Sequence, residues 1–214
     1  MLKRLPKNAR VTLSILFIIT GLFLIFFNYF DGIKSNIFNE KNIELYEQEI
    51  VLSEQVEVTT EDESVDEANK EVTTPSTKET YIGYLSIPDI NLKRGFTSLD
   101  SEYNSLHYNV MLVDGSSMPD VKNGNLILAS HSGSSSIAFF KNLYKLSNGA
   151  HAYVTYNGKV YDYKLVNTYD VLKTGTVKIS RNGDVNTLTL ITCSKTDNSQ
   201  QLVFIFELQN VTNA

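Results

Sequence analysis

The chain has 214 residues, a formal net charge of −5 and a single cysteine, and its composition is uneven along its length. One cysteine excludes an internal disulfide. The scattered carboxylates and histidines lack the spacing of metal ligands, so we expect no metal and no other cofactor. Residues 80–214 carry nearly equal numbers of acidic and basic side chains and no basic stripe interleaved with aromatics. Nucleic-acid binding therefore has little support.

The first predicted element is an apolar stretch of 20 residues without a formal charge, which begins at Val11 and ends at Phe30. As a helix it is about long enough to cross a hydrocarbon core of roughly 30 Å, so we predict a transmembrane helix. Four basic residues precede it, whereas only Asp31 and Lys34 follow closely. The positive-inside rule then puts residues 1–10 in the cytoplasm and the rest outside the cell. The alternatives are a buried globular helix and a cleaved signal peptide, which usually has a shorter apolar core.

An acidic segment comes next, with 13 acidic and three basic residues between positions 40 and 79. It has no sustained apolar stripe, so it cannot bury enough surface to offset its ordering entropy. We therefore predict that residues 31–79 form an acidic extracellular tether, with a specific binding tail as the alternative. Within it, Ile43, Tyr46 and Ile50 fall near one face of a possible short helix.

Short runs rich in Val, Ile, Thr and aromatic residues begin at Tyr81, as is typical of strands. In chain order they are YIGYLSI, NVMLV, NLILAS, HAYVTY, KVYDYKLVNTYDVL, TLTLIT and LVFIFEL. Asn157-Gly158 predicts a two-residue hairpin turn, because both residues tolerate positive φ. Apolar residues at helical spacing predict one helix over residues 137–146. The pattern predicts a mostly β domain over residues 80–214, folded as a closed or nearly closed barrel.

The only cysteine, Cys193, ends the alternating run TLTLITC and is followed by the polar loop SKTDNSQ. It lies on the opposite face of the strand from the leucines. Such a thiol is either packing material or a nucleophile, and the residues alone leave both open. A nucleophile needs a partner, usually histidine. His131 is favoured because NLILAS delivers it to a strand end and small residues follow, whereas we expect exposed or structural roles for His107 and His151.

The pairing of LASHSG with a later TLITC, behind an apolar N-terminal stretch and an acidic segment, resembles the sortases. The similarity runs from about Tyr81 to Leu208 and includes YLSIPDI and AFFKNLYKL. It implies the sortase β-barrel, with about seven or eight strands and one or two short helices. It also implies a cysteine transpeptidase of Gram-positive bacteria that acts on cell-wall proteins. The subclass is unassigned, either class B-like or another single-anchor type.

The resemblance also implies roles for two residues. Cys193 would attack a carbonyl of the sorting signal in a secreted protein to form a thioacyl enzyme, and His131 would protonate the departing amine. The acceptor would be a peptidoglycan precursor or a pilin amine, and hydrolysis by the same route is a variant. The chain shows no second hydrophobic segment and no clear lid motif, so we favour single-protein anchoring over pilin linking.

One position departs from the sortase pattern. Sortases usually have an arginine at the start of the strand after the cysteine loop, where this chain has Gln201. Glutamine keeps hydrogen-bond donors but loses the charge. Three interpretations follow: Gln201 acts as a neutral donor to the oxyanion, Lys195 or Arg94 supplies charge instead, or the enzyme is slow or inactive. We favour the first; under the last, the barrel is an anchored binding module whose catalysis has lapsed.

Overall fold

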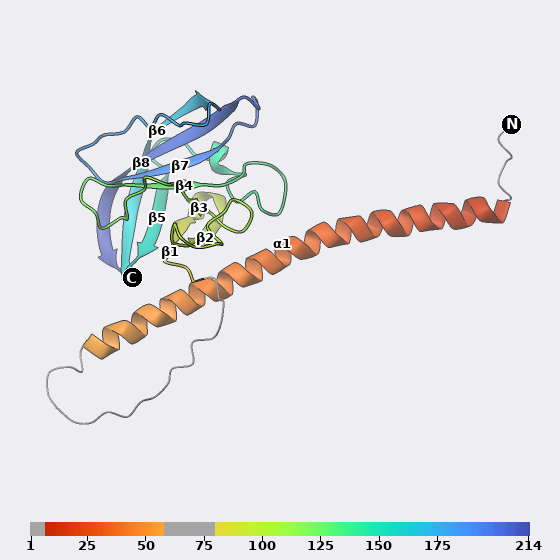
Figure 1. Cartoon of the computed structure of the whole chain (residues 1–214), viewed down its shortest axis with the longest axis horizontal. Coiled ribbons are helices and arrows are strands. Elements are labelled where there is room, and N and C mark those ends of the chain that lie inside the picture. The colour runs from red at the N-terminus through yellow and green to blue at the C-terminus, as the bar shows by residue number, and fades with distance from the viewer. Residues whose placement is uncertain (1–6, 58–79) are drawn as a thin grey trace, which may run out of the picture.

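The structure is a computed structural model that describes residues 7–57 and 80–214. One long helix, α1 (Lys7–Glu57), precedes a domain of strands. Figure 1 shows this domain beside the C-terminal half of α1, while the N-terminal half of the helix extends away from it. Within the described ranges, no helix has the length and hydropathy that a membrane crossing requires.

The strand domain forms one curled sheet, consistent with the nearly closed barrel that we predicted (Figure 1). Its elements are β1 (Gly83–Ile87), η1 (Pro88–Ile90), β2 (Leu92–Phe96), β3 (Met111–Leu112), β4 (Asn125–Ala129), η2 (Leu143–Lys145), β5 (His151–Tyr156), β6 (Lys159–Leu172), β7 (Thr187–Cys193) and β8 (Gln200–Asn213). The strand order is β2-β1-β5-β6-β8-β7-β4-β3. Every pairing is antiparallel except that of β4 with β7.

All seven predicted runs contain a strand, and the mostly β fold is confirmed. The predicted turn is confirmed as well: Asn157 has φ 50° and Gly158 has φ 70°, and the two residues join β5 to β6. Positive φ at both central positions is the conformation that matches the twist of the flanking strands. Strand β2 was not expected, because it carries two charged residues and a glycine.

The helix predicted over residues 137–146 was wrong, because only the single 3-10 turn η2 forms there. Of the three residues that suggested a helix, Phe140 and Leu143 are buried in the barrel core on an irregular path, whereas Tyr144 is exposed. The amide of Phe140 donates to the carbonyl of His131 at 3.0 Å, and not to the residue four positions earlier as a helix would require. Core burial therefore produced a helical spacing without a helix.

Helix α1 contains the predicted helix at 11–30 but continues to Glu57. This differs from our expectation that residues 31–57 belong to a tether with at most a short helix beginning at Ile43. The helix is ordered there because it packs on the barrel: Ile43 and Tyr46 form a buried cluster with Tyr81. Partly buried Ile50 packs against the same cluster, so the apolar face expected from the sequence is the docked face. The rest of the tether, residues 58–79, lies outside the described residues, as do residues 1–6.

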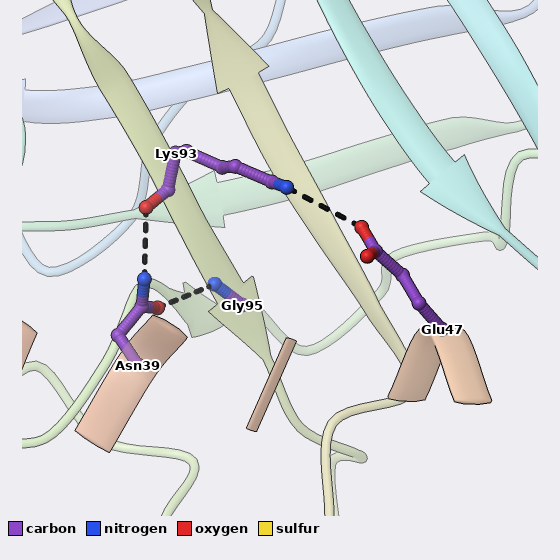
Figure 2. Close-up of polar contacts among 4 residues, drawn as sticks. All are labelled: Asn39, Glu47, Lys93 and Gly95. Atoms are coloured by element: carbon purple, nitrogen blue, oxygen red, sulfur yellow. Dashed lines mark hydrogen bonds and ion pairs between the residues drawn. The ribbon is translucent and has the colours of Figure 1, made fainter. Parts of the chain in front are cut away.

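Polar contacts add to this docking, as Figure 2 shows. The side-chain amide of Asn39 donates to the carbonyl of Lys93 at 3.0 Å and accepts from the amide of Gly95 at 3.1 Å. A residue of a neighbouring parallel strand would contact the backbone on either side of position 94 in the same way. Farther along the helix, Glu47 pairs with Lys93 at 3.3 Å. The backbone of edge strand β2 is therefore partly satisfied by the side chain of a helix.

Candidate active site

The site is built on the parallel pair β4–β7, whose register runs from Asn125 opposite Thr187 to Ala129 opposite Ile191. The contact continues beyond this ladder. The amide of Ser130 donates to the carbonyl of Ile191 at 3.2 Å, and the hydroxyl of Thr192 donates to the carbonyl of Ser130 at 2.8 Å. The contact between these two segments therefore extends past the ladder, toward His131 and Cys193.

His131 and Cys193 each lie two residues past the last pair of this ladder, Ala129 and Ile191. Because side chains alternate along a strand, the equal offset favours the same face of the sheet for both. The leucines of β4 and β7 lie in the barrel core, on the alternate positions: Leu126, Leu128, Leu188 and Leu190. His131 and Cys193 are both half-buried, and both line one cavity of about 700 Å³. The two strand ends thus converge on a single cleft.

The loop after His131 is tied back to the barrel and to α1. Besides the bond from Phe140 to the carbonyl of His131, the guanidinium of Arg94 stands 4.2 Å from the ring centre of Phe139. The same guanidinium donates to the carbonyl of Ser35 at 3.2 Å. Burial lowers the pKa of Arg94. Arg94 lines a second cavity beside α1 and is not among the residues that line the cleft, so it does not fit the role of a charge at Cys193.

The loop after Cys193 is closed by its own hydrogen bonds. The amide of Ser194 donates to the carbonyl of Gln200 at 3.1 Å. Asp197 accepts from the hydroxyl of Ser199 at 2.6 Å and from its amide at 2.8 Å. These two bonds lower the pKa of the Asp197 carboxyl. The loop therefore turns back directly after the thiol, which leaves Cys193 at an accessible strand end.

Gln201 is the register partner of Cys193 on the antiparallel strand β8. Side chains of directly opposed residues share a face of the sheet, with Cβ atoms about 4.5 to 5.5 Å apart. Gln201 is half-buried, and it is not among the residues that line the cleft. The register therefore puts Gln201 beside the thiol of Cys193. That its side-chain amide donates to the oxyanion stays a prediction.

The other two histidines lie away from the cleft. Nδ1 of His151 is 2.6 Å from a carboxylate oxygen of Asp162, and the exposed ring of His107 packs edge-on against Tyr108 at 5.1 Å. Neither residue lines the cavity that holds Cys193. Of the three histidines, His131 is the one that the fold brings to the thiol's cleft, as the sequence analysis expected.

Two cations of the cleft were not expected from the sequence. Lys141, from the loop after His131, and Lys173, directly after β6, line it together with Lys195. Lys141 lies within AFFKNLYKL, a run that the resemblance includes, but nothing in that run marks it as a cation of the cleft, and no motif marks Lys173. Only the fold of their loops brings them together.

Comparison with known proteins agrees with this geometry. The family model described as the sortase domain matches residues 85–209, so the chain belongs to the sortase family. Sortase D5 transpeptidase of Clostridium perfringens is similar in structure, with a TM-score of 0.59 at 20% identity over 81% of this chain and 99% of that one. A comparison with curated protein sequences gives no match.

Two streptococcal structures are similar as well. Sortase C-3 of Streptococcus pneumoniae has a TM-score of 0.58 at 23% identity, over 85% of this chain and 92% of that one. Sortase C1 of Streptococcus agalactiae has a TM-score of 0.55 at 27% identity, over 64% and 71%. Because similar structures carry class A, class C and class D names, they leave the subclass unassigned.

Proposed function

We propose that the chain is a membrane-anchored cysteine transpeptidase, which cleaves a sorting signal in secreted proteins and transfers them to an amine of the cell wall. The observation that carries this proposal is the equal offset of His131 and Cys193 past the β4–β7 ladder, at one cleft. A thiol and an imidazole delivered to the same cleft supply a nucleophile and a proton donor.

The proposed chemistry proceeds in two steps. The thiolate of Cys193 attacks the carbonyl carbon of the scissile peptide bond, a carbon–sulfur bond forms, and the carbon–nitrogen bond breaks as His131 gives its proton to the departing amine. An acceptor amine then attacks the thioester, an amide forms, and the thiolate leaves while His131 takes up the proton released by the amine. Covalent catalysis thus divides amide exchange into two easier steps.

The negative charge that develops on the carbonyl oxygen needs a donor. Gln201 is our candidate, because it stands opposite Cys193 in the β7–β8 register and its amide can donate without a charge. Lys195 is the alternative donor, since it lines the same cleft.

The membrane anchor is part of the proposal and rests on residues 11–30. The side chains described in this stretch include Phe17, Ile18 and Phe23, which are 63% to 70% exposed on a part of α1 that the barrel does not cover. Exposed apolar side chains in such number indicate a surface that meets another apolar phase. Protease added to intact protoplasts should release the barrel, whereas a mature chain that begins after Phe30 would contradict the anchor.

A second candidate function follows from Gln201 itself. If the missing arginine has abolished catalysis, the barrel is an anchored binding module that holds a sorting peptide without cleaving it. The two candidates differ in whether Cys193 becomes acylated.

The deciding experiment incubates the full chain in neutral detergent with a peptide library and an amine acceptor, and identifies the cleaved bond and the transfer product by mass spectrometry. We expect a thioester adduct on Cys193 and one preferred cleavage motif. His151→Ala is the matched control for His131→Ala. A library bound without any adduct would favour the binding module.

A further inference from the structure

The cleft around Cys193 carries only positive formal charge. Three of the described residues that line it are lysines, Lys141, Lys173 and Lys195, and none is Asp or Glu. Residues 80–214, which contain the cleft, carry nearly equal numbers of acidic and basic side chains. The cationic cleft is therefore not a consequence of composition.

The three ammonium groups are exposed, and among the described residues none of them forms an ion pair. Lys195 stands 3.9 Å from the ring centre of Tyr144, and Lys173 donates to the carbonyl of Asn198 at 2.8 Å. Lys173 contributes to the lowered pKa of Asp197, but that carboxylate is bound to Ser199 and does not line the cleft. The positive charge of the cleft therefore stays largely uncompensated.

The cations also flank the reacting groups. Lys141 comes from the loop that follows His131, and Lys195 lies two residues after Cys193. A peptide bound in this cleft therefore meets lysines from both loops. A carboxylate on that peptide gains an ion pair and is steered into the cleft, whereas a lysine or arginine there is repelled.

We propose that the cleft selects sorting signals that carry Asp or Glu beside the scissile bond. The inference rests on the proposed function, because it names the substrate class of the same site. Exposed ion pairs are weak, so each carboxylate that meets a lysine raises affinity by about twofold to fivefold. Salt screens such pairs over about 3 Å at 1 M, so the preference is nearly lost there.

Binding to the full-chain Cys193→Ala variant in neutral detergent tests this without any need for turnover. Two isotopically distinguished pools of random octapeptides, one with two fixed Asp residues and one with Asn at those positions, are equilibrated with the variant and the bound fractions compared. We expect the Asp pool to be enriched at least twofold at low salt and not in 1 M salt. Equal retention at low salt overturns the inference. Failure of the wild-type chain to cleave any peptide contradicts the proposed function but not the inferred preference for acidic peptides.

Charge reversal shows whether the lysines of the cleft cause the preference for the Asp pool. In the Cys193→Ala background, Lys141→Glu should reduce or invert the preference for the Asp pool, and Lys195→Glu is the second variant if the first does not fold. Lys159→Glu is the matched control, because Lys159 is exposed, opens β6 at the end opposite Lys173 and does not line the cleft. A reversal at Lys159 with the same effect as one in the cleft would overturn the inference.

Discussion

The parallel pair β4–β7 and the contact between α1 and β2 join distant parts of the chain by different means. Backbone hydrogen bonds hold β4 to β7, and their register sets where His131 and Cys193 emerge. Side chains hold α1 to β2, with the amide of Asn39 in the place that a neighbouring strand would occupy. The side chains at the ends of β4 and β7 are free to take part in chemistry, whereas those between α1 and β2 stabilise the docking of the helix. Substitutions should therefore affect activity in one region and unfolding in the other.

The largest effect is expected for Cys193→Ala, which should abolish acyl transfer, because no other thiol is present in the chain. The variant should unfold at nearly the same denaturant concentration as the parent, since Cys193 lies at a strand end. Adduct formation and turnover measure the loss of acyl transfer, and a urea titration measures the stability of the variant. Retained turnover with an intact fold would end the covalent mechanism.

His131→Ala should lower turnover by at least about a hundredfold, as expected when a group that donates and accepts protons is removed. His107→Ala and His151→Ala are the matched controls, because neither residue lines the cleft. Steady-state kinetics on one sorting peptide compares all three. A larger loss for either control would contradict the assignment of His131.

The shared place of these two residues at one cleft was predictable, because Cys193 ends a strand and His131 follows one closely. Their catalytic roles stay a prediction. Other features depend on partners remote in sequence. The docked face of α1 was visible in Ile43, Tyr46 and Ile50, but its partner Tyr81 is not a neighbour in the chain. Strand β2 was missed because it contains Gly95, and glycine is uncommon in strands. The glycine is needed because a Cβ at this position would lie 2.0 Å from the Tyr81 ring.

Gln201 tests whether β8 contributes to the chemistry of the β4–β7 site. If it donates to the oxyanion, Gln201→Ala should lower turnover by roughly a hundred- to thousandfold, or about 2.7 to 4 kcal/mol, with peptide affinity much less affected. Gln201→Arg restores the residue usual in the family and should support activity. Single-turnover kinetics of Gln201→Ala separates the change in turnover from the change in peptide affinity. If Gln201→Ala is as fast as the parent, Lys195 is the next donor to test.

The contact between α1 and β2 should respond in stability instead. Asn39 is 4% exposed, and Asn39→Ala leaves the carbonyl of Lys93 and the buried amide of Gly95 without their partner. We expect a loss of about 1 to 3 kcal/mol in the free energy of unfolding, reduced slightly because alanine favours the helix. Amide hydrogen exchange at Gly95 should accelerate while exchange in β7 does not. An unchanged rate at Gly95 would show that the amide finds another partner.

The smallest effect is expected for the ion pair drawn beside Asn39 in Figure 2. Glu47 and Lys93 are 3.3 Å apart, but their side chains are 47% and 52% exposed, so water and salt screen the attraction. Glu47→Ala should change the free energy of unfolding by no more than about 1 kcal/mol, and still less at high salt. It is the matched control for Asn39→Ala, because both positions lie on α1 and both side chains reach Lys93. Urea titrations of the two variants at low and high salt make the comparison. If Glu47→Ala is as destabilising as Asn39→Ala, the exposed charges and not the buried amide dominate the docking of the helix.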